Sequence, residues 1–157
     1  MTIAENATQT PRFAEPTDYE DDFESWSYEQ AELLRQRRFA ELDLPNVIEE
    51  LESMGSEQRH ALESSYRLVI AHLLKWQFQP QLRSSSWEIT IARERVNIAR
   101  REEKNRALRA GAKQILESVY RDAVREAAME TGLPRDTFPF DCPYAAEQLR
   151  DHDWMPA

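Results

Sequence analysis

Hydrophobic residues recur at helical spacing along most of the chain. Leu62, Tyr66, Val69 and Leu73 follow one another three or four residues apart, and between residues 68 and 76 apolar positions go almost all round such a helix. A helix that is apolar on several sides is usually central and covered by its neighbours. Runs in which apolar and polar residues alternate, with β-branched enrichment, do not stand out. The pattern predicts an all-α fold, a single-domain helical bundle wrapped around this segment.

Glycine and proline lie between the apolar repeats and mark the expected helix ends. Both weaken a helix interior, glycine by about 1 kcal/mol and proline by about 3 kcal/mol. The glycines are Gly55, Gly111 and Gly132, and none of the prolines interrupts an apolar helical repeat. About five helices are therefore expected, over 18–37, 45–54, 56–79, from 85 towards a break at Gly111, and 112–131. An aromatic, proline-rich strap over 138–144 and a short helix over 143–150 complete the expected fold.

The expected helices carry start signals and apolar stripes. Thr17 with Glu20 and Ser85 with Glu88 each fit a capping box at a helix start. Residues 1–16 lack periodicity and are expected to be a flexible N-terminal tail, which leaves 17–157 as one helical domain. The expected stripes are Phe23, Trp26, Gln30, Leu33 and Leu34 on the first helix, Val47, Ile48, Leu51 and Met54 on the second, Ile91, Ala92, Val96, Ile98 and Ala99 on the fourth, and Ile115, Leu116, Val119, Ala123 and Ala127 on the fifth.

Composition places the chain among soluble globular proteins. It has 157 residues, of which 41% are hydrophobic and 31% charged. No apolar run approaches the roughly 20 residues of a membrane span, and the N-terminus has no visible secretory signal. The single cysteine, Cys142, excludes an intrachain disulfide and a multi-cysteine zinc site. A cytoplasmic protein without a membrane partner is the expectation.

Charge is unevenly spread over the sequence. The net charge is −9, but residues 15–63 carry −11 and residues 82–113 carry +5. One interpretation is two neighbouring helices of opposite sign that attract each other within the fold. The other is a basic face for nucleic acid, made of Arg83, Arg93, Arg100, Arg101 and Lys104. The first is favoured, because overall acidity opposes long-range attraction to phosphate.

Four residues are candidates for acid–base chemistry. His72 lies in the apolar segment, and a neighbouring carboxylate such as Glu49 could make it a general acid or base near neutral pH. The favoured alternative is a core histidine whose ring nitrogens bond to a carboxylate or a carbonyl. Arg95 interrupts the apolar stripe of the fourth helix, and a buried arginine needs a paired carboxylate. Glu49 or Glu50 would suit, which predicts a structural ion pair between the second and fourth helices.

Cofactor and metal chemistry find little support in the sequence. Glu57 and His60 have the Glu-x-x-His spacing of di-iron bundles, but that architecture needs a second copy, which is absent. Cys142 could act as a nucleophile only beside a base. Phosphate-binding glycine loops, nucleophile elbows and zinc-protease motifs are not found. We therefore expect no cofactor and no metal.

Several short motifs together resemble a known family. They include Tyr19-Glu-Asp-Asp-Phe23 with Trp26, Val47-Ile-Glu-Glu-Leu-Glu-Ser-Met-Gly55, His72-Leu-Leu-Lys-Trp76, Ser86-Trp87, Glu130-Thr-Gly-Leu-Pro134 and Cys142-Pro-Tyr144. The chain resembles, from about residue 19 to 156, the largely bacterial family called domain of unknown function 29. One departure is Asn105-Arg-Ala-Leu108, where such sequences tend to have a Pro-Ser-Leu turn. The resemblance implies an α-helical fold and no particular activity.

The sequence therefore favours a small helical protein-interaction domain without catalytic activity. Its partner would be another protein or a second copy of the chain, as in a homodimer. A nucleic-acid-associated protein that uses the basic face of residues 83–113 is one alternative, and an enzyme centred on His72 is another.

Overall fold

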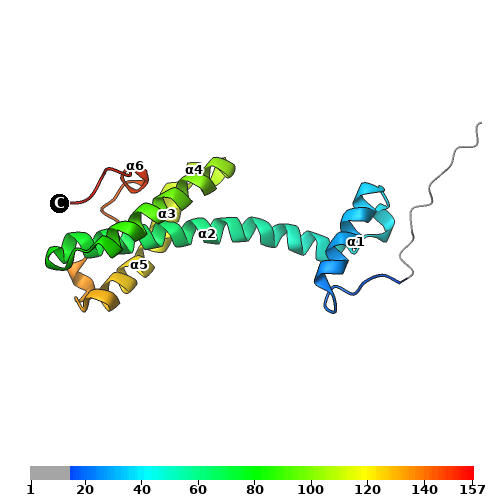
Figure 1. The fold of residues 1–157 in the computed structure, drawn as a ribbon, viewed down its shortest axis with the longest axis horizontal. Coiled ribbons are helices and arrows are strands. Elements are labelled where there is room, and N and C mark those ends of the chain that lie inside the picture. Colours follow the sequence, from blue (N-terminus) through cyan, green and yellow to red (C-terminus); the bar gives the residue numbers. More distant parts are fainter. Residues whose placement is uncertain (1–14) are drawn as a thin grey trace, which may run out of the picture. The chain divides into compact units, whose positions relative to one another are not determined.

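The computed structural model describes residues 15–157, so residues 1–14 of the expected tail lie outside the described residues. The described part is helical and contains no strand, which confirms the all-α bundle (Figure 1). Its helices are α1 (Phe23–Arg35), α2 (Leu44–Phe78), α3 (Ser85–Lys104), α4 (Arg106–Ala110), α5 (Ala112–Thr131) and α6 (Ala146–Arg150). Short 3₁₀ turns lie at Phe39–Glu41, Pro80–Leu82 and Arg135–Thr137.

The contacts divide the chain into two compact units, with the boundary after Ser53. Unit 1 contains α1 and the first turns of α2, and unit 2 contains the rest of α2 and everything that follows. That residues 17–157 form a single domain stays a prediction of the sequence.

The prediction of two helices over 45–54 and 56–79 is wrong, because α2 runs unbroken from Leu44 to Phe78. Gly55 lies inside it, and nothing approaches within 4 Å of the place where its Cβ would be. The cost of an interior glycine is only about 1 kcal/mol. The surrounding residues favour helix strongly enough to exceed that cost, so the glycine is tolerated rather than used as a stop.

Unit 1 is held together by side chains of α1 that bond to the start of α2. The indole of Trp26 donates to Asp43 Oδ2 at 3.1 Å, and Gln30 Oε1 accepts the Asp43 backbone N–H at 2.8 Å. The prediction that Thr17 caps the first helix is wrong. Asp22 caps it instead, accepting the Ser25 N–H at 3.0 Å.

Unit 2 has one hydrophobic core, centred on the second half of α2. There Leu62, Tyr66 and Val69 are fully buried, as are Ile70, Leu73 and Leu74, which confirms the central segment. The α5 stripe is also confirmed, because Ile115, Leu116, Val119, Ala123 and Ala127 are all buried. The α3 stripe is narrower than expected: Ile91 and Ile98 are buried, but Ala92, Val96 and Ala99 are exposed.

The helices after α3 end at the predicted glycines, and one further break lies at Asn105. Asn105 separates α3 from α4, and Gly111 separates α4 from α5, as expected. Gly132 ends α5 in the left-handed conformation at φ 72°, where an L side chain would be strained.

The chain then crosses the core as the expected strap. The Tyr120 hydroxyl donates to the Pro139 carbonyl at 2.6 Å, and the Tyr144 hydroxyl donates to Gln77 Oε1 at 2.8 Å. These bonds fix the strap against α5 and α2.

Candidate functional site

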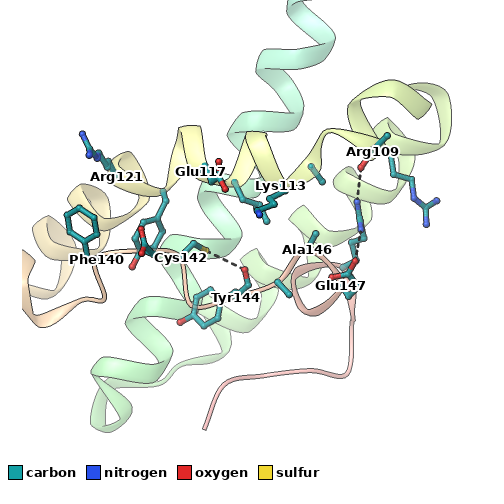
Figure 2. A pocket seen from close by; sticks show the side chains of 16 residues that line it. Arg109, Lys113, Glu117, Arg121, Phe140, Cys142, Tyr144, Ala146 and Glu147 are labelled. Carbon is teal, nitrogen blue, oxygen red and sulfur yellow. Dashed lines mark hydrogen bonds and ion pairs between the residues drawn. The ribbon is translucent and has the colours of Figure 1, made fainter.

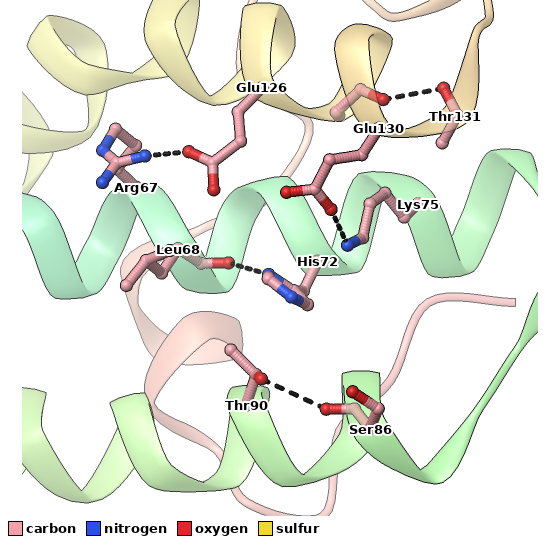
Figure 3. A network of polar contacts seen from close by, with 10 residues as sticks. Arg67, Leu68, His72, Lys75, Ser86, Thr90, Glu126, Glu130 and Thr131 are labelled. Atoms are coloured by element: carbon pink, nitrogen blue, oxygen red, sulfur yellow. Dashed lines mark hydrogen bonds and ion pairs between the residues drawn. The ribbon is translucent and has the colours of Figure 1, made fainter.

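The ring of His72 lies half-buried on α2 and bonds to the backbone of its own helix. Its Nδ1 is 2.9 Å from the Leu68 carbonyl oxygen, and in residues 15–157 no carboxylate bonds to the ring (Figure 3). This is the arrangement of a core histidine. A catalytic role for His72 stays a prediction, and the two cavities beside α5 are lined by other residues.

Burial lowers the pKa of His72, and the nearby Lys75 ammonium lowers it further. The ring is therefore neutral over more of the pH range than a free histidine. A neutral ring whose Nδ1 is already engaged leaves only Nε2 for any further interaction.

The two candidate glutamates, Glu49 and Glu50, belong to unit 1. Glu50 accepts a hydrogen bond from the Tyr19 hydroxyl, and this bond is the main reason that the pKa of Tyr19 rises to about 12. Glu49 is exposed. The structure thus gives Glu50 a role within unit 1, and a catalytic role for either carboxylate stays a prediction.

The predicted ion pair between Arg95 and Glu49 or Glu50 is wrong. Arg95 is buried, but its guanidinium donates to backbone carbonyls of the C-terminal segment: Trp154 at 2.8 Å, Leu149 at 3.0 Å, Gln148 at 3.2 Å and His152 at 3.5 Å. The last carbonyls of a helix accept no hydrogen bond from within the helix. Because they carry partial negative charge, they attract a cation. Arg95 therefore ties α6 and the chain after it to α3.

The expected basic face is not uniform. Arg83 lies over the Trp76 ring at 4.8 Å and donates to its carbonyl, Arg93 pairs with Glu94 at 3.1 Å, and half-buried Arg101 donates to a serine on α2. Arg100 and Lys104 are exposed and form no ion pair within residues 15–157. Most of the predicted phosphate-binding face is thus engaged within unit 2, and nucleic-acid binding stays a prediction.

A cavity with a volume of about 640 Å³ lies between α5 and the strap. Figure 2 shows Arg121 and Phe140 at one end of this strap cavity and Arg109 and Glu147 at the other. Four basic side chains line it, and three acidic side chains oppose them. Of the basic ones, Arg150 is already paired with Glu102 at 2.8 Å. The remaining charges balance, so the cavity favours neither an anion nor a cation.

Cys142 lines the strap cavity without the features of a nucleophile. It is half-buried, its Sγ is 3.6 Å from the Tyr144 carbonyl oxygen, and burial raises the pKa of the thiol. A reactive cysteine needs the opposite shift, towards the thiolate. The thiol therefore serves packing here.

Unit 1 carries an apolar surface that its described residues, 15–53, leave exposed. Leu44, Ile48 and Leu51 are spaced four and three residues apart on α2, so they share one face of the helix. Their exposed fractions are 53%, 47% and 63%. The prediction that Ile48 and Leu51 point inward is wrong in the part of the chain that the structure describes. We call these three side chains the α2 stripe.

The surroundings of the α2 stripe are acidic. Between Glu15 and Ser53 there are 13 acidic and 3 basic residues, which gives a net charge of −10. Glu50 and Glu52 lie on α2 itself beside the stripe. An apolar strip bordered by carboxylates is complementary to a helix that is apolar on one face and basic on its flanks.

Comparison with known families gives one match. The model of Domain of unknown function DUF29 matches residues 19–155. The chain belongs to this family. No curated protein and no solved structure matches it. In this DUF29 member, several residues of the shared motifs hold the fold: Trp26 bonds to Asp43, Glu130 to Lys75, and Tyr144 to Gln77. Membership thus leaves the function to be argued from surfaces.

Two buried ionic groups of this DUF29 member were not predicted from the sequence. Glu102 is buried, accepts from the Tyr66 hydroxyl, and is held by two bonds from Arg150, at 2.8 and 2.9 Å. Nothing in the run from Arg100 to Lys104 distinguishes Glu102 from an exposed carboxylate. Lys75 is buried and pairs with Glu130 (Figure 3). Here a signal existed, since a lysine directly after buried Leu74 requires a partner.

None of the described helices is long and apolar enough to cross a membrane. Within residues 15–157 there is also no group of three or more side chains that could hold a metal ion, and both Glu57 and His60 are exposed.

Proposed function

We propose that the protein is a protein-binding module that captures a basic, amphipathic helix of another protein on the α2 stripe. The observation that carries the proposal is the stripe itself: three aliphatic side chains on one helical face, about half exposed. Monomeric proteins scatter single apolar side chains over their surfaces, but a contiguous strip indicates a binding site. We place this module in the cytoplasm of a bacterium, in keeping with the single cysteine and the family resemblance.

The chemistry of the partner follows from what borders the stripe. Helix-in-groove recognition uses apolar anchors three and four residues apart, and the spacing of Leu44, Ile48 and Leu51 offers matching positions. The net charge of −10 between Glu15 and Ser53 favours lysine and arginine on the flanks of the partner. Covering the exposed half of each of the three side chains would contribute about 1 kcal/mol apiece.

A designed peptide tests this proposal. The probe is a fluorescent helix with leucines three and four residues apart and lysines elsewhere, and its partner control has glutamates in place of the lysines. Binding is measured by fluorescence anisotropy in 0.15 M salt. We expect the basic peptide to bind, and Ile48→Glu or Leu51→Glu to weaken it about tenfold. Both substitutions add negative charge, which favours a basic peptide, so weaker binding reports lost apolar contact.

The matched control is Ile89→Glu on α3, because Ile89 is 63% exposed and the added charge is the same. Equal binding of the basic and acidic peptides would contradict the proposal, and so would equal effects of Ile48→Glu and Ile89→Glu. Sedimentation of the protein alone provides a further check. If the protein forms a dimer and Leu51→Glu dissociates it, the α2 stripe binds a second copy of the chain and not a basic helix of another protein.

A further inference from the structure

A second cavity adjoins the strap cavity on unit 2 and differs from it in charge. Its volume is about 510 Å³, and it lies between α5 and the chain from Arg135 to Phe140. Tyr120, Arg121 and Phe140 line both cavities, so the two are neighbours. We call the second one the arginine cavity.

The charged groups of the arginine cavity are mostly basic. Arg121, Arg125 and Arg135 line it, and Asp136 is the one acidic residue among its lining residues. Arg125 has a partner, Asp122, at 3.3 Å, but both side chains are more than half exposed. Arg121 and Arg135 form no ion pair within residues 15–157. Two exposed guanidiniums are thus available to a ligand, and each can hold a carboxylate through two parallel hydrogen bonds.

The rest of the lining is apolar and aromatic. Phe140 is 87% exposed, although it stands in a strap whose Phe138 is buried. Val124 and Pro139 add aliphatic surface. An exposed ring beside two guanidiniums offers an apolar contact and an ionic contact within one small volume.

The backbone that carries this surface is held in place before any ligand arrives. Gly132 ends α5, and the Thr131 hydroxyl accepts the Leu133 N–H at 3.2 Å. The Tyr120 hydroxyl holds the Pro139 carbonyl at 2.6 Å, and Phe138 packs edge-on against Phe78 with ring centroids 5.4 Å apart. A preorganised loop gives up less conformational freedom on binding.

We propose that the arginine cavity binds an acidic peptide segment of another protein, with carboxylates on Arg121 and Arg135 and an aromatic or aliphatic anchor residue against Phe140. Charge decides between this ligand and the basic helix proposed for unit 1, because three arginines against one aspartate repel a basic segment. The inference does not rest on the α2 stripe. It makes the protein a module with two sites of opposite preference.

The test uses a fluorescent nonapeptide with four glutamates around a central phenylalanine. One control peptide has glutamines for the glutamates and another has alanine for the phenylalanine. We expect the acidic peptide to bind the full-length protein and both control peptides to bind at least tenfold more weakly. Arg121→Glu and Arg135→Glu should each reduce affinity at least tenfold, whereas Arg100→Glu on α3 should change it less than threefold. Phe140→Ala should weaken binding about fivefold, and Met129→Ala, which removes another highly exposed apolar side chain, should not.

Two results would overturn the inference. One is that Arg121→Glu and Arg100→Glu have equal effects, which would make the binding a general response to charge. The other is that a single-stranded oligonucleotide displaces the peptide and binds more tightly, which would identify nucleic acid as the ligand. Ile48→Glu should leave acidic-peptide binding unchanged, so failure of the α2 stripe and failure of the arginine cavity are distinguishable.

Discussion

Replacing Arg95 with methionine removes the guanidinium that holds the C-terminal segment while keeping most of the aliphatic packing. Four carbonyls, those of Gln148, Leu149, His152 and Trp154, lose a donor at once. A hydrogen bond to a charged group contributes about 1.5–3 kcal/mol, but burying the guanidinium costs part of that sum. Burial indeed lowers the pKa of Arg95, and only Asp151 opposes this shift. We expect a net loss of about 3 kcal/mol in the free energy of unfolding.

Urea denaturation of the wild type and Arg95→Met measures this loss. The matched control is Arg100→Met on the same helix, where an exposed arginine is expected to change stability by less than about 0.5 kcal/mol. Hydrogen exchange adds a local measurement, because the amides of α6 should exchange much faster in Arg95→Met. A loss below about 1 kcal/mol, or unchanged protection of α6, would refute the assignment of Arg95 as the clamp of the C-terminal segment.

Three further predictions concern the core and the joints. Leu73→Ala on α2 should lower the free energy of unfolding by about 3 kcal/mol because Leu73 is fully buried. Leu51→Ala on the same helix should lower it by less than about 1 kcal/mol. Equal losses in urea denaturation would mean that Leu51 is covered. The pKa of His72 is lowered in the folded state, so unfolding takes up a proton, and stability should fall as pH drops below about 6.5. In His72→Gln the free energy of unfolding should change less between pH 7.5 and 5.5 than in the wild type. If the pH dependence is unaltered, other groups cause it. Gly132→Ala should cost about 1 kcal/mol through its positive φ, since no atom lies near the added Cβ, and a neutral thermal melt would argue against that strain.

The helix positions were largely readable from the sequence because they depend on local preferences. The span 112–131, the break at Gly111 and the left-handed stop at Gly132 all follow from residues next to one another in the chain. Gly55 is the instructive failure. It carries the same signal as Gly111, yet α2 continues through it, because an interior glycine costs little when both flanks favour helix.

The candidate surfaces were much less predictable. The α2 stripe has the same kind of apolar spacing as the buried stripe of α5. Such spacing indicates that one face of a helix is apolar, but it does not indicate which segment, if any, covers that face. The arginine cavity lies between α5 and the chain from Arg135 to Phe140, and no short-range pattern links Arg121 to Phe140.

By itself the sequence determined that the described chain is helical, that α5 spans 112–131, and that the apolar positions between Leu62 and Leu74 are buried, because each depends on residues within a few turns. Only the tertiary structure decided the partner of Arg95, the burial of Glu102 and the exposure of Phe140. The physical reason is that a buried charge can be satisfied by any donor or acceptor that packing brings near it. For Arg95 those acceptors are backbone carbonyls, which every residue carries and no sequence pattern can single out.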